Sequence, residues 1–210
     1  MGGRPGVPTF RFEKACTATP VAGIDEAGRG PLAGPVVAAA VILDRDALPR
    51  RLARRIDDSK KLEPEEREHL FEAIRPYAEI GVGEASVEEI DRFNILRATF
   101  LAMYRALGGL PRVPAIALVD GNQAPKLAVP VQTIIGGDAL SLSIAAASIV
   151  AKVTRDRMMA SFDSLYPGYG WITNKGYGTE EHRAALLHLG PCPLHRRSFS
   201  LFSEDRLIED

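Results

Sequence analysis

The sequence is poor in the features that mark several large classes of protein. Its 210 residues include only two cysteines and one tryptophan, and 26 basic against 27 acidic residues leave a formal charge of −1. The two cysteines, Cys16 and Cys192, make no metal-binding pattern and could form at most one disulfide, so a disulfide-rich scaffold is excluded. The near-zero charge excludes a uniformly basic nucleic-acid-binding chain, although a local basic face can still bind nucleic acid.

Long hydrophobic runs are also missing. The best candidate, residues 35–43, has about half of the roughly 18 apolar residues that a membrane span needs. The first residues, MGGRPGVPTFRFEK, lack the apolar core of a secretory signal. The content of 46% hydrophobic and 25% charged residues is typical of a globular protein and excludes disorder as the main state. We therefore expect a cytoplasmic protein that does not bind membranes.

The order of the predicted elements indicates one α/β domain with a mixed central sheet flanked by helices. At about 150 residues per domain, this length suits a single domain with a small appendage. We expect a loose arm over residues 1–19, a main domain over residues 20–165, and a C-terminal helix and loop extension over residues 166–210. Strands are predicted at 21–25, 36–43, 79–84, 115–120 and 129–135, and the longest helix at 139–165.

Residues 36–43 are all apolar, which favours a strand buried on both faces, although the pattern alone also fits a buried helix. Helix starts are marked by capping residues. Ser86 with Glu89 forms a capping box, and Asn94 and Thr179 can each cap a further helix.

Four acidic residues stand where predicted strands end. Asp25 and Glu26 close the first strand, Asp120 is the last residue of a buried strand, and Asp138 lies between a strand and a helix. Sites in α/β sheets gather at strand ends. Carboxylates converging there would form a hard oxygen cage for Mg²⁺ or Mn²⁺. Two such ions about 4 Å apart can hydrolyse a phosphodiester.

Each acid also has a plain structural interpretation. Asp120 with Gly121 is a common turn pair, Asp138 is a good helix N-cap, and Asp25 and Glu26 can solvate a loop. Adjacent residues of a regular strand also point to opposite faces, so Asp25 and Glu26 reach one site only if the strand ends or bulges there.

Other catalytic chemistry has less support. The sequence has no GxSxG, CxxC or HExxH motif, and the glycine-rich GRGPLAG segment lacks the spacing of a P-loop. Its four histidines are scattered along the chain, which makes a metal role for any one of them a minor possibility. These are His69, His182, His188 and His195.

Several residues are candidates for contact with a sugar-phosphate backbone. In Gly28-Arg29-Gly30 the glycines let backbone amides approach a ligand, and the arginine can fork onto a phosphate. A close amide or carbonyl there could sense a ribose 2′-hydroxyl. Tyr177, in a glycine-flanked loop, could stack on a sugar or base or could simply pack. Further candidates, each equally explained as a solvated side chain, are Ser59, Lys60, Lys61, Lys152, Arg155, and Arg196 with Arg197.

Eight segments of the sequence follow one another in a recognisable order. They are GIDEAGRGPLAGPVVAAAVIL, DSKKL, EEIDRFNILRAT, VDGN, GGD, AASIVAKVTRD, NKGYGT and GPCPLHRRSF. Together they resemble ribonuclease HII. The resemblance covers roughly residues 21–199, with its motifs in family order, and the DEAGRG block alone is quite specific. No long segment precedes Asp25, which separates the pattern from that of ribonuclease HIII.

The resemblance implies a ribonuclease H-like fold with a small helical C-terminal part, in which residues 20–165 are catalytic and residues 166–210 contribute to substrate binding. It implies an endonuclease that cuts RNA paired with DNA, 5′ to a ribonucleotide, even a single one in duplex DNA. Ribonucleotide excision repair and primer removal are the expected roles. The products carry 3′-hydroxyl and 5′-phosphate ends. The implied catalytic, metal-binding residues are Asp25, Glu26, Asp120 and Asp138.

By the same resemblance, Gly28-Arg29-Gly30 reads the RNA-to-DNA junction through the 2′-hydroxyl, and Tyr177 packs on the neighbouring deoxyribose. Two ions, Mg²⁺ or Mn²⁺, would activate the attacking water and offset charge on the departing 3′-oxygen. The tail LFSEDRLIED lacks the double-aromatic box that some relatives use to bind a sliding clamp, and a monomer is expected. The alternatives are another ribonuclease H-like DNA nuclease, of resolvase or integrase type, and a non-catalytic nucleic-acid-binding module.

Overall fold

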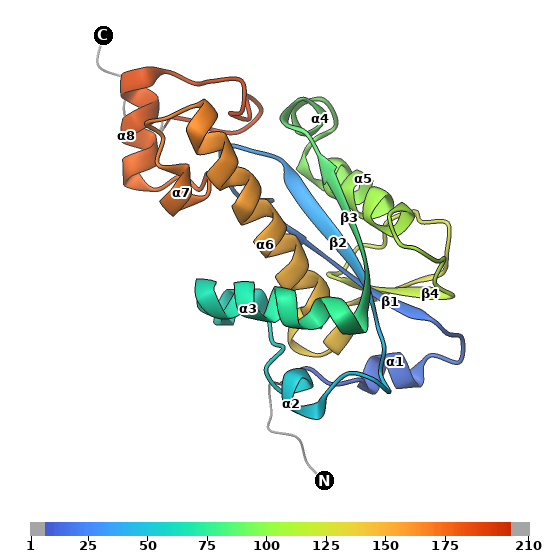
Figure 1. The fold of residues 1–210 in the computed structure, drawn as a ribbon. Coiled ribbons are helices and arrows are strands. Elements are labelled where there is room, and N and C mark those ends of the chain that lie inside the picture. The colour runs from blue at the N-terminus through green and yellow to red at the C-terminus, as the bar shows by residue number, and fades with distance from the viewer. Residues whose placement is uncertain (1–6, 203–210) are drawn as a thin grey trace.

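The computed structural model, which describes residues 7–202, contains a five-stranded mixed sheet between two sets of helices (Figure 1). The strands lie in the order β3-β2-β1-β4-β5. β2 is antiparallel to both β1 and β3, whereas β4 is parallel to both β1 and β5. Their bounds are β1 (Val21–Ala27), β2 (Val36–Leu43), β3 (Ala78–Ala85), β4 (Ile116–Asp120) and β5 (Val131–Ile134).

Helices cover both faces of the sheet. On one face, Ala38 and Ala40 of β2 pack in a core cluster with Ala102 of α5 (Ile95–Gly108), next to α4 (Val87–Phe93). On the other face, Ala39 and Val41 pack with residues of α6 (Leu142–Leu165) and α3 (Pro64–Ile74). All eight residues of β2 are buried, which confirms the strand buried on both faces and excludes the buried helix.

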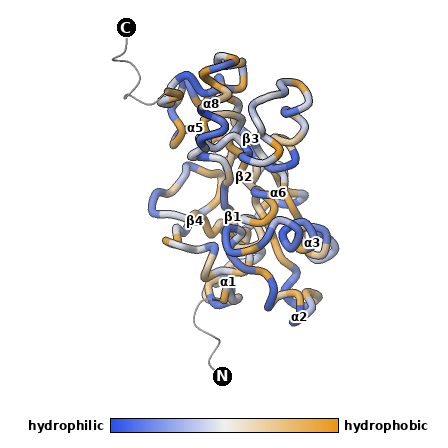
Figure 2. Tube along the Cα trace, turned by 90° about the vertical axis from the view of Figure 1, so that its left-hand side faces the viewer, coloured by the Kyte–Doolittle hydropathy of each residue, from blue (hydrophilic) through white to orange (hydrophobic). Residues whose placement is uncertain are grey.

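The approach of α6 to the sheet depends on Gly23 in β1. A Cβ atom at this position would lie 2.1 Å from the backbone carbon of Ser143 in α6. Glycine therefore lets the start of α6 lie directly on β1, beside the strand end that carries the first two acids. α3, by contrast, is largely hydrophilic in Figure 2 and buries only Leu70 and Ile74.

The C-terminal part packs on the second half of α6 (Figure 1). Met159 of α6 contacts Trp171 and Leu186 in a separate core cluster. None of the described helices is long and apolar enough to cross a membrane. The remaining elements are α1 (Arg11–Ala15), α2 (Arg50–Ala53), α7 (Trp171–Asn174), α8 (Glu180–Leu189), and three 3₁₀ turns: η1 (Ser59–Lys61), η2 (Arg75–Tyr77) and η3 (Gly137–Ala139).

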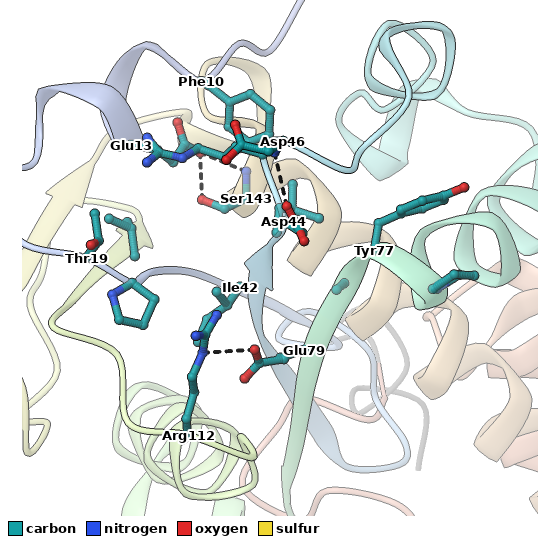
Figure 3. A pocket seen from close by; sticks show the side chains of 16 residues that line it. Phe10, Glu13, Thr19, Ile42, Asp44, Asp46, Tyr77, Glu79, Arg112 and Ser143 are labelled. Atoms are coloured by element: carbon teal, nitrogen blue, oxygen red, sulfur yellow. Dashed lines mark hydrogen bonds and ion pairs between the residues drawn. The ribbon is translucent and has the colours of Figure 1, made fainter.

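The N-terminal segment differs from the loose arm predicted over residues 1–19. Glu13 of α1 is 2% exposed, and its Oε1 atom accepts a hydrogen bond from Ser141 Oγ at 2.6 Å. The same atom accepts from Ser143 N at 2.9 Å and Ser143 Oγ at 2.7 Å (Figure 3). Thr9 N also donates to Leu140 O. The prediction was therefore wrong for residues 9–15, because these tertiary bonds outweigh the Gly- and Pro-rich composition.

Glu13 lines a pocket of about 620 Å³ between the start of β1, the end of β2 and the start of β3 (Figure 3). This is the end of the sheet opposite to the ends of β1 and β4 that carry the predicted acids.

The predicted helix caps are confirmed, with one exception. Ser86 and Glu89 form the capping box, and the side chains of Asn94 and Thr179 accept from backbone amides of α5 and α8. Asp138, however, does not cap the long helix. It lies in η3, and Ser141 caps α6 instead, since the glycines before Asp138 add a tight turn between strand and helix.

Candidate active site

Two of the acids stand side by side at the ends of parallel strands. The register pairs Ile24 of β1 with Val119 of β4, so Asp25 and Asp120 are the next pair along. Corresponding residues of neighbouring strands point to the same face of a sheet. That face is covered by α6, because Asp25 lies two residues after Gly23, which contacts that helix.

Asp25 is almost completely enclosed, with 3% of its surface exposed. Burial, followed by the charges of Glu26 and Asp120, raises the pKa of Asp25 well above its ordinary value. Hydrogen bonds from Ser148 and from the amide of Glu26, the latter at 2.8 Å, oppose this rise. A buried carboxylate repelled by its neighbours binds a cation more readily than an isolated one.

Asp120 is bonded to the turn that carries Asp138. Gly137 N donates to Asp120 Oδ1 at 2.6 Å, and Asp138, the next residue, is 6% exposed. Burial raises the pKa of Asp120, against the bond from Gly137, and the charge of Asp138 raises it further. The bond between Gly137 and Asp120 thus holds the turn of residues 137–139, and with it Asp138, next to Asp120.

The charge of Glu26 acts on Asp25 and Asp120 although β1 has no bulge at this point. β1 keeps its pairing to β2 through Glu26 and Ala27, whereas β4 ends at Asp120. The Glu26 side chain is 12% exposed, and its Oε1 lies 3.2 Å from the Arg29 guanidinium. Burial raises the pKa of Glu26, against the effect of Arg29, and the charge of Asp120 raises it further.

Lys60 supplies the positive charge at this cluster. Its Nζ lies 3.0 Å from Asp138 Oδ2 and 3.8 Å from Asp58 Oδ1, while most of the side chain remains exposed. Partial burial would lower the pKa of Lys60, but the bond to Asp138 and the surrounding acids raise it overall. Lys60, predicted as a phosphate contact, therefore lies against a catalytic candidate.

The donor set fits a hard divalent cation, since it offers carboxylate oxygens alone and three of the four acids have raised pKa values. The predicted cage is nevertheless open. No three His, Cys, Asp or Glu side chains within residues 7–202 are grouped closely enough to hold a metal ion. Mutual repulsion of the carboxylates and the bond of Lys60 to Asp138 account for this spread.

The Gly28-Arg29-Gly30 loop directly follows the first two acids. Gly28 has φ +95°, and a Cβ there would lie 2.0 Å from Arg155 Nε, so no other residue fits. Arg29 and Gly30 are exposed. Within the described part of the chain, neither of their N–H groups has a hydrogen-bond acceptor. Two adjacent free amides are available to a ligand.

Arg155 and Arg196 contact the protein instead of solvent, contrary to the predicted phosphate contacts. Both are 0% exposed. Their guanidinium groups donate only to backbone carbonyls, among them Ala33 and Pro35 for Arg155 and Gly28 and Gly34 for Arg196. The prediction treated arginines as surface residues, whereas these two fill a polar space lined with carbonyl oxygens.

Tyr177 lies beside the loop. It is 43% exposed, and a Cβ on Gly30 would lie 3.8 Å from its ring. Lys152 Nζ lies 5.8 Å from the centre of the ring and 2.7 Å from Asp156. Lys61 is exposed and bonded to Asp57.

Ser59 does not face solvent. It is 4% exposed and shares a hydrogen bond of 2.8 Å with Ser148, the residue that bonds Asp25. Sequence reasoning missed Ser148, for which the available signal was a hydroxyl in an alanine-rich helix.

A buried histidine pair, also missed, holds the backbone of Tyr177. His182 Nδ1 donates to Tyr177 O at 2.9 Å, and His182 Nε2 lies 3.1 Å from His195 Nε2 and 3.2 Å from Trp171 Nε1. Burial, followed by the neighbouring His182, lowers the pKa of His195 to about 4. The thirteen-residue separation of these histidines gave no sequence signal for their contact.

Comparison with known proteins identifies the family. The sequence profile of the family described as Ribonuclease HII matches residues 22–202. This chain belongs to the ribonuclease HII family. A ribonuclease HII of Rhizorhabdus wittichii is 62% identical over 193 residues, which cover 92% of this chain and 93% of that relative.

Solved structures agree with this assignment. The ribonuclease H2 of Pyrococcus horikoshii OT3 matches with a TM-score of 0.71 and 30% identity, over 86% of this chain and 94% of that one. The ribonuclease HII in a PCNA complex from Archaeoglobus fulgidus gives 0.72 and 27%, over 88% and 96%. The fold is thus ribonuclease H-like, as predicted, and this ribonuclease HII is an endonuclease that hydrolyses RNA in RNA/DNA hybrids.

Proposed function

We propose that this ribonuclease HII cuts 5′ to ribonucleotides, including a single one embedded in duplex DNA, and leaves 3′-hydroxyl and 5′-phosphate ends. Ribonucleotide excision repair and primer removal are the corresponding roles. One observation supports this most strongly: the ion pair of 3.2 Å between Glu26 and Arg29 joins the acid cluster to the loop with two free amides. A group that senses a ribose thus lies next to a group suited to hydrolysis.

We infer that Asp25, Glu26, Asp120 and Asp138 hold Mg²⁺ or Mn²⁺. When bound, two such ions supply a nucleophilic water at neutral pH and stabilise the leaving oxygen. Asp25 and Asp120, side by side on parallel strands, would hold the ions together with the other two acids. Asp138, whose Oδ2 accepts from Lys60 Nζ in this structure, would supply a further carboxylate ligand.

The protein side chains and amides orient the substrate. The free N–H groups of Arg29 and Gly30 donate to the 2′-oxygen, which deoxyribose lacks. The exposed face of Tyr177 packs on the sugar beyond the ribonucleotide. The guanidinium of Arg29, 50% exposed, remains available to a phosphate while it pairs with Glu26.

We propose that the enzyme acts as a monomer. The PCNA complex is a property of the relative from Archaeoglobus fulgidus. The tail in which we found no clamp-binding motif ends in residues 203–210, which lie outside the described residues.

The test is cleavage of a labelled DNA duplex that carries one ribonucleotide, with Mg²⁺ or Mn²⁺, beside the same duplex made of DNA alone. We expect a single cut 5′ to the ribonucleotide and an intact control. Equal cutting of both duplexes would favour a resolvase-type nuclease. No cutting with either metal, together with no metal binding in a titration, would favour a non-catalytic binding module.

A further inference from the structure

Two buried arginines surround the loop that we propose to read the ribose. The loop connects β1 to β2 through residues 28–35. Arg196 donates to Gly28 O at 2.6 Å, Arg29 O at 3.0 Å and Gly34 O at 2.9 Å. Arg155 donates to Ala33 O at 3.0 Å. Both arginines also bond Pro35 O, so five carbonyl groups of one short loop point at two cations.

The direction of these carbonyls fixes the direction of the amides. In a trans peptide unit the C=O of one residue and the N–H of the next point in opposite directions. The carbonyls of Gly28 and Arg29 point inward to Arg196. The N–H groups of Arg29 and Gly30, neither of which has an acceptor within residues 7–202, therefore point outward.

Burying the charged side chains of Arg155 and Arg196 costs solvation free energy. Both arginines are 0% exposed, and none of the hydrogen bonds that the structure gives their guanidinium groups goes to a carboxylate. Burial lowers the pKa of Arg155 to about 10 and that of Arg196 to about 9, the latter with a contribution from the charge of Arg155. Apolar residues of similar volume commonly replace buried charges without loss of stability, so packing alone does not require two charged groups here.

We propose that Arg155 and Arg196 are positioning residues for ribonucleotide recognition, which hold the carbonyls of the loop inward so that its amides face the 2′-hydroxyl. This inference rests on the proposed function. A cation on the carbonyl also polarises the peptide unit and makes its N–H a stronger donor. Arg155 extends the effect to the second recognition element, because its Nη1 donates at 2.9 Å to Lys175 O, two residues before Tyr177.

The experiment measures affinity and discrimination in separate variants, Arg196→Met, Arg196→Lys and Arg155→Lys. Each is titrated by fluorescence anisotropy, in EDTA to stop hydrolysis, with a DNA duplex carrying one ribonucleotide and with the all-DNA duplex. Lysine keeps the charge but its single ammonium cannot reach several carbonyls in the fork geometry of a guanidinium. Arg183→Met is the matched control, because Arg183 also donates to a backbone carbonyl of the C-terminal part, Leu201 O, but its guanidinium has no hydrogen bond to residues 28–35.

We expect the Arg196 variants to lose about tenfold in affinity for the ribonucleotide duplex, with all-DNA affinity within about twofold of wild type. Arg155→Lys should lose less, since Arg155 does not contact the carbonyls next to the free amides. If the arginines only stabilise the fold, each substitution reduces the fraction of folded protein and lowers both apparent affinities by the same factor. That result would overturn the inference. Unchanged discrimination in every variant would overturn it as well.

A variant that fails to fold does not end the test. The amide resonances of Arg29 and Gly30 in a ¹⁵N–¹H spectrum of folded Arg155→Lys should move while those of β5 stay, and their constancy contradicts the proposal. If the wild-type enzyme cuts both duplexes equally in the presence of Mg²⁺ or Mn²⁺, the proposed function fails instead. Cleavage by the wild-type enzyme therefore separates the two failures.

Discussion

His195 Nε2 lies 3.1 Å from His182 Nε2, and a single proton lies between them. Cys192 N donates to His195 Nδ1 at 3.0 Å, so the proton of His195 is on Nε2. His182 uses its own proton on Tyr177 O, so its Nε2 accepts from both His195 and Trp171. The network is complete only when both imidazoles are neutral.

This pair predicts a loss of stability in mild acid. The pKa of His195 is lowered from 6.5 to about 4 in the folded protein, by burial and then by His182. Above pH 6.5 both the folded and the unfolded states hold a neutral histidine. Below pH 6.5 the unfolded state binds a proton on His195, whereas in the folded state His195 stays mostly neutral down to about pH 4. The free energy of unfolding should fall by on the order of 2 kcal/mol between pH 6.5 and pH 4, as measured by urea unfolding.

Other groups titrate in the same range, so a variant isolates this contribution. His195→Gln keeps an amide N–H near the position of Nε2 but does not titrate. We expect its stability to fall less steeply with acid than that of wild type. Parallel pH profiles for the two proteins would contradict the prediction, because they would show that His195 has the same pKa in the folded and unfolded states.

Asp120→Asn should remove activity without unfolding the enzyme. The amide oxygen of asparagine still accepts from Gly137 N, so the turn that carries Asp138 is kept. The charge is lost, and with it one cation ligand. Cleavage of an RNA/DNA hybrid should fall by at least about 100-fold, more than loss of an outer-shell partner costs. A thermal melt should place the midpoint at or above that of wild type, because repulsion among the acids is relieved. Near-normal cleavage would contradict the assignment.

Lys60→Met should make the fold depend more on a divalent cation. Lys60 neutralises Asp138 at 3.0 Å, and its removal leaves the carboxylates to repel one another. In EDTA the midpoint of thermal unfolding should drop by roughly 2 °C, and added Mg²⁺ should close the gap to wild type. Lys61→Met is the control, because Lys61 pairs with Asp57 instead. Equal responses of the two variants to Mg²⁺ would disprove this role.

Glu13→Ala should destabilise the protein although Glu13 lies at the end of the sheet opposite to the acids. The change leaves the hydroxyl and amide donors of Ser141 and Ser143 without their acceptor. Unpaired buried donors cost about 2–3 kcal/mol, which chemical denaturation can measure. Glu65→Ala, on the exposed side of α3, should change stability by less than about 0.5 kcal/mol. A similar small effect of both substitutions would contradict a structural role for Glu13.

Much of this architecture follows from local pattern. The apolar run of β2 predicts a doubly buried strand, and Ser86, Asn94 and Thr179 cap helices through bonds within three residues of themselves. The sequence predicts the acids at strand ends because the residues that precede them in the chain form apolar runs typical of buried strands. Parallel pairing of β1 with β4 then brings Asp25 beside Asp120.

The missed features depend on contacts between distant segments. Nothing near Glu13 in the sequence indicates that Ser141 and Ser143 will surround it. Arginine is predicted to be exposed because burying its charge is costly, so the carbonyl-lined interior around Arg155 and Arg196 has no local signature. Asp138 lies between a strand and a helix as predicted, but Ser141 caps the helix because Gly136 and Gly137 open a turn that the sequence pattern did not indicate.

The loop of residues 28–35 reaches its final bonding late in synthesis. Gly28 and Arg196, which bond each other, are 168 positions apart, and Ala33 pairs with His195 across a similar interval. A chain leaving the ribosome has exposed all four acids once Asp138 has emerged, yet the loop gains its fixed geometry only when Arg196 follows. We therefore expect the selectivity that we propose for this loop to appear only after Arg196 has emerged.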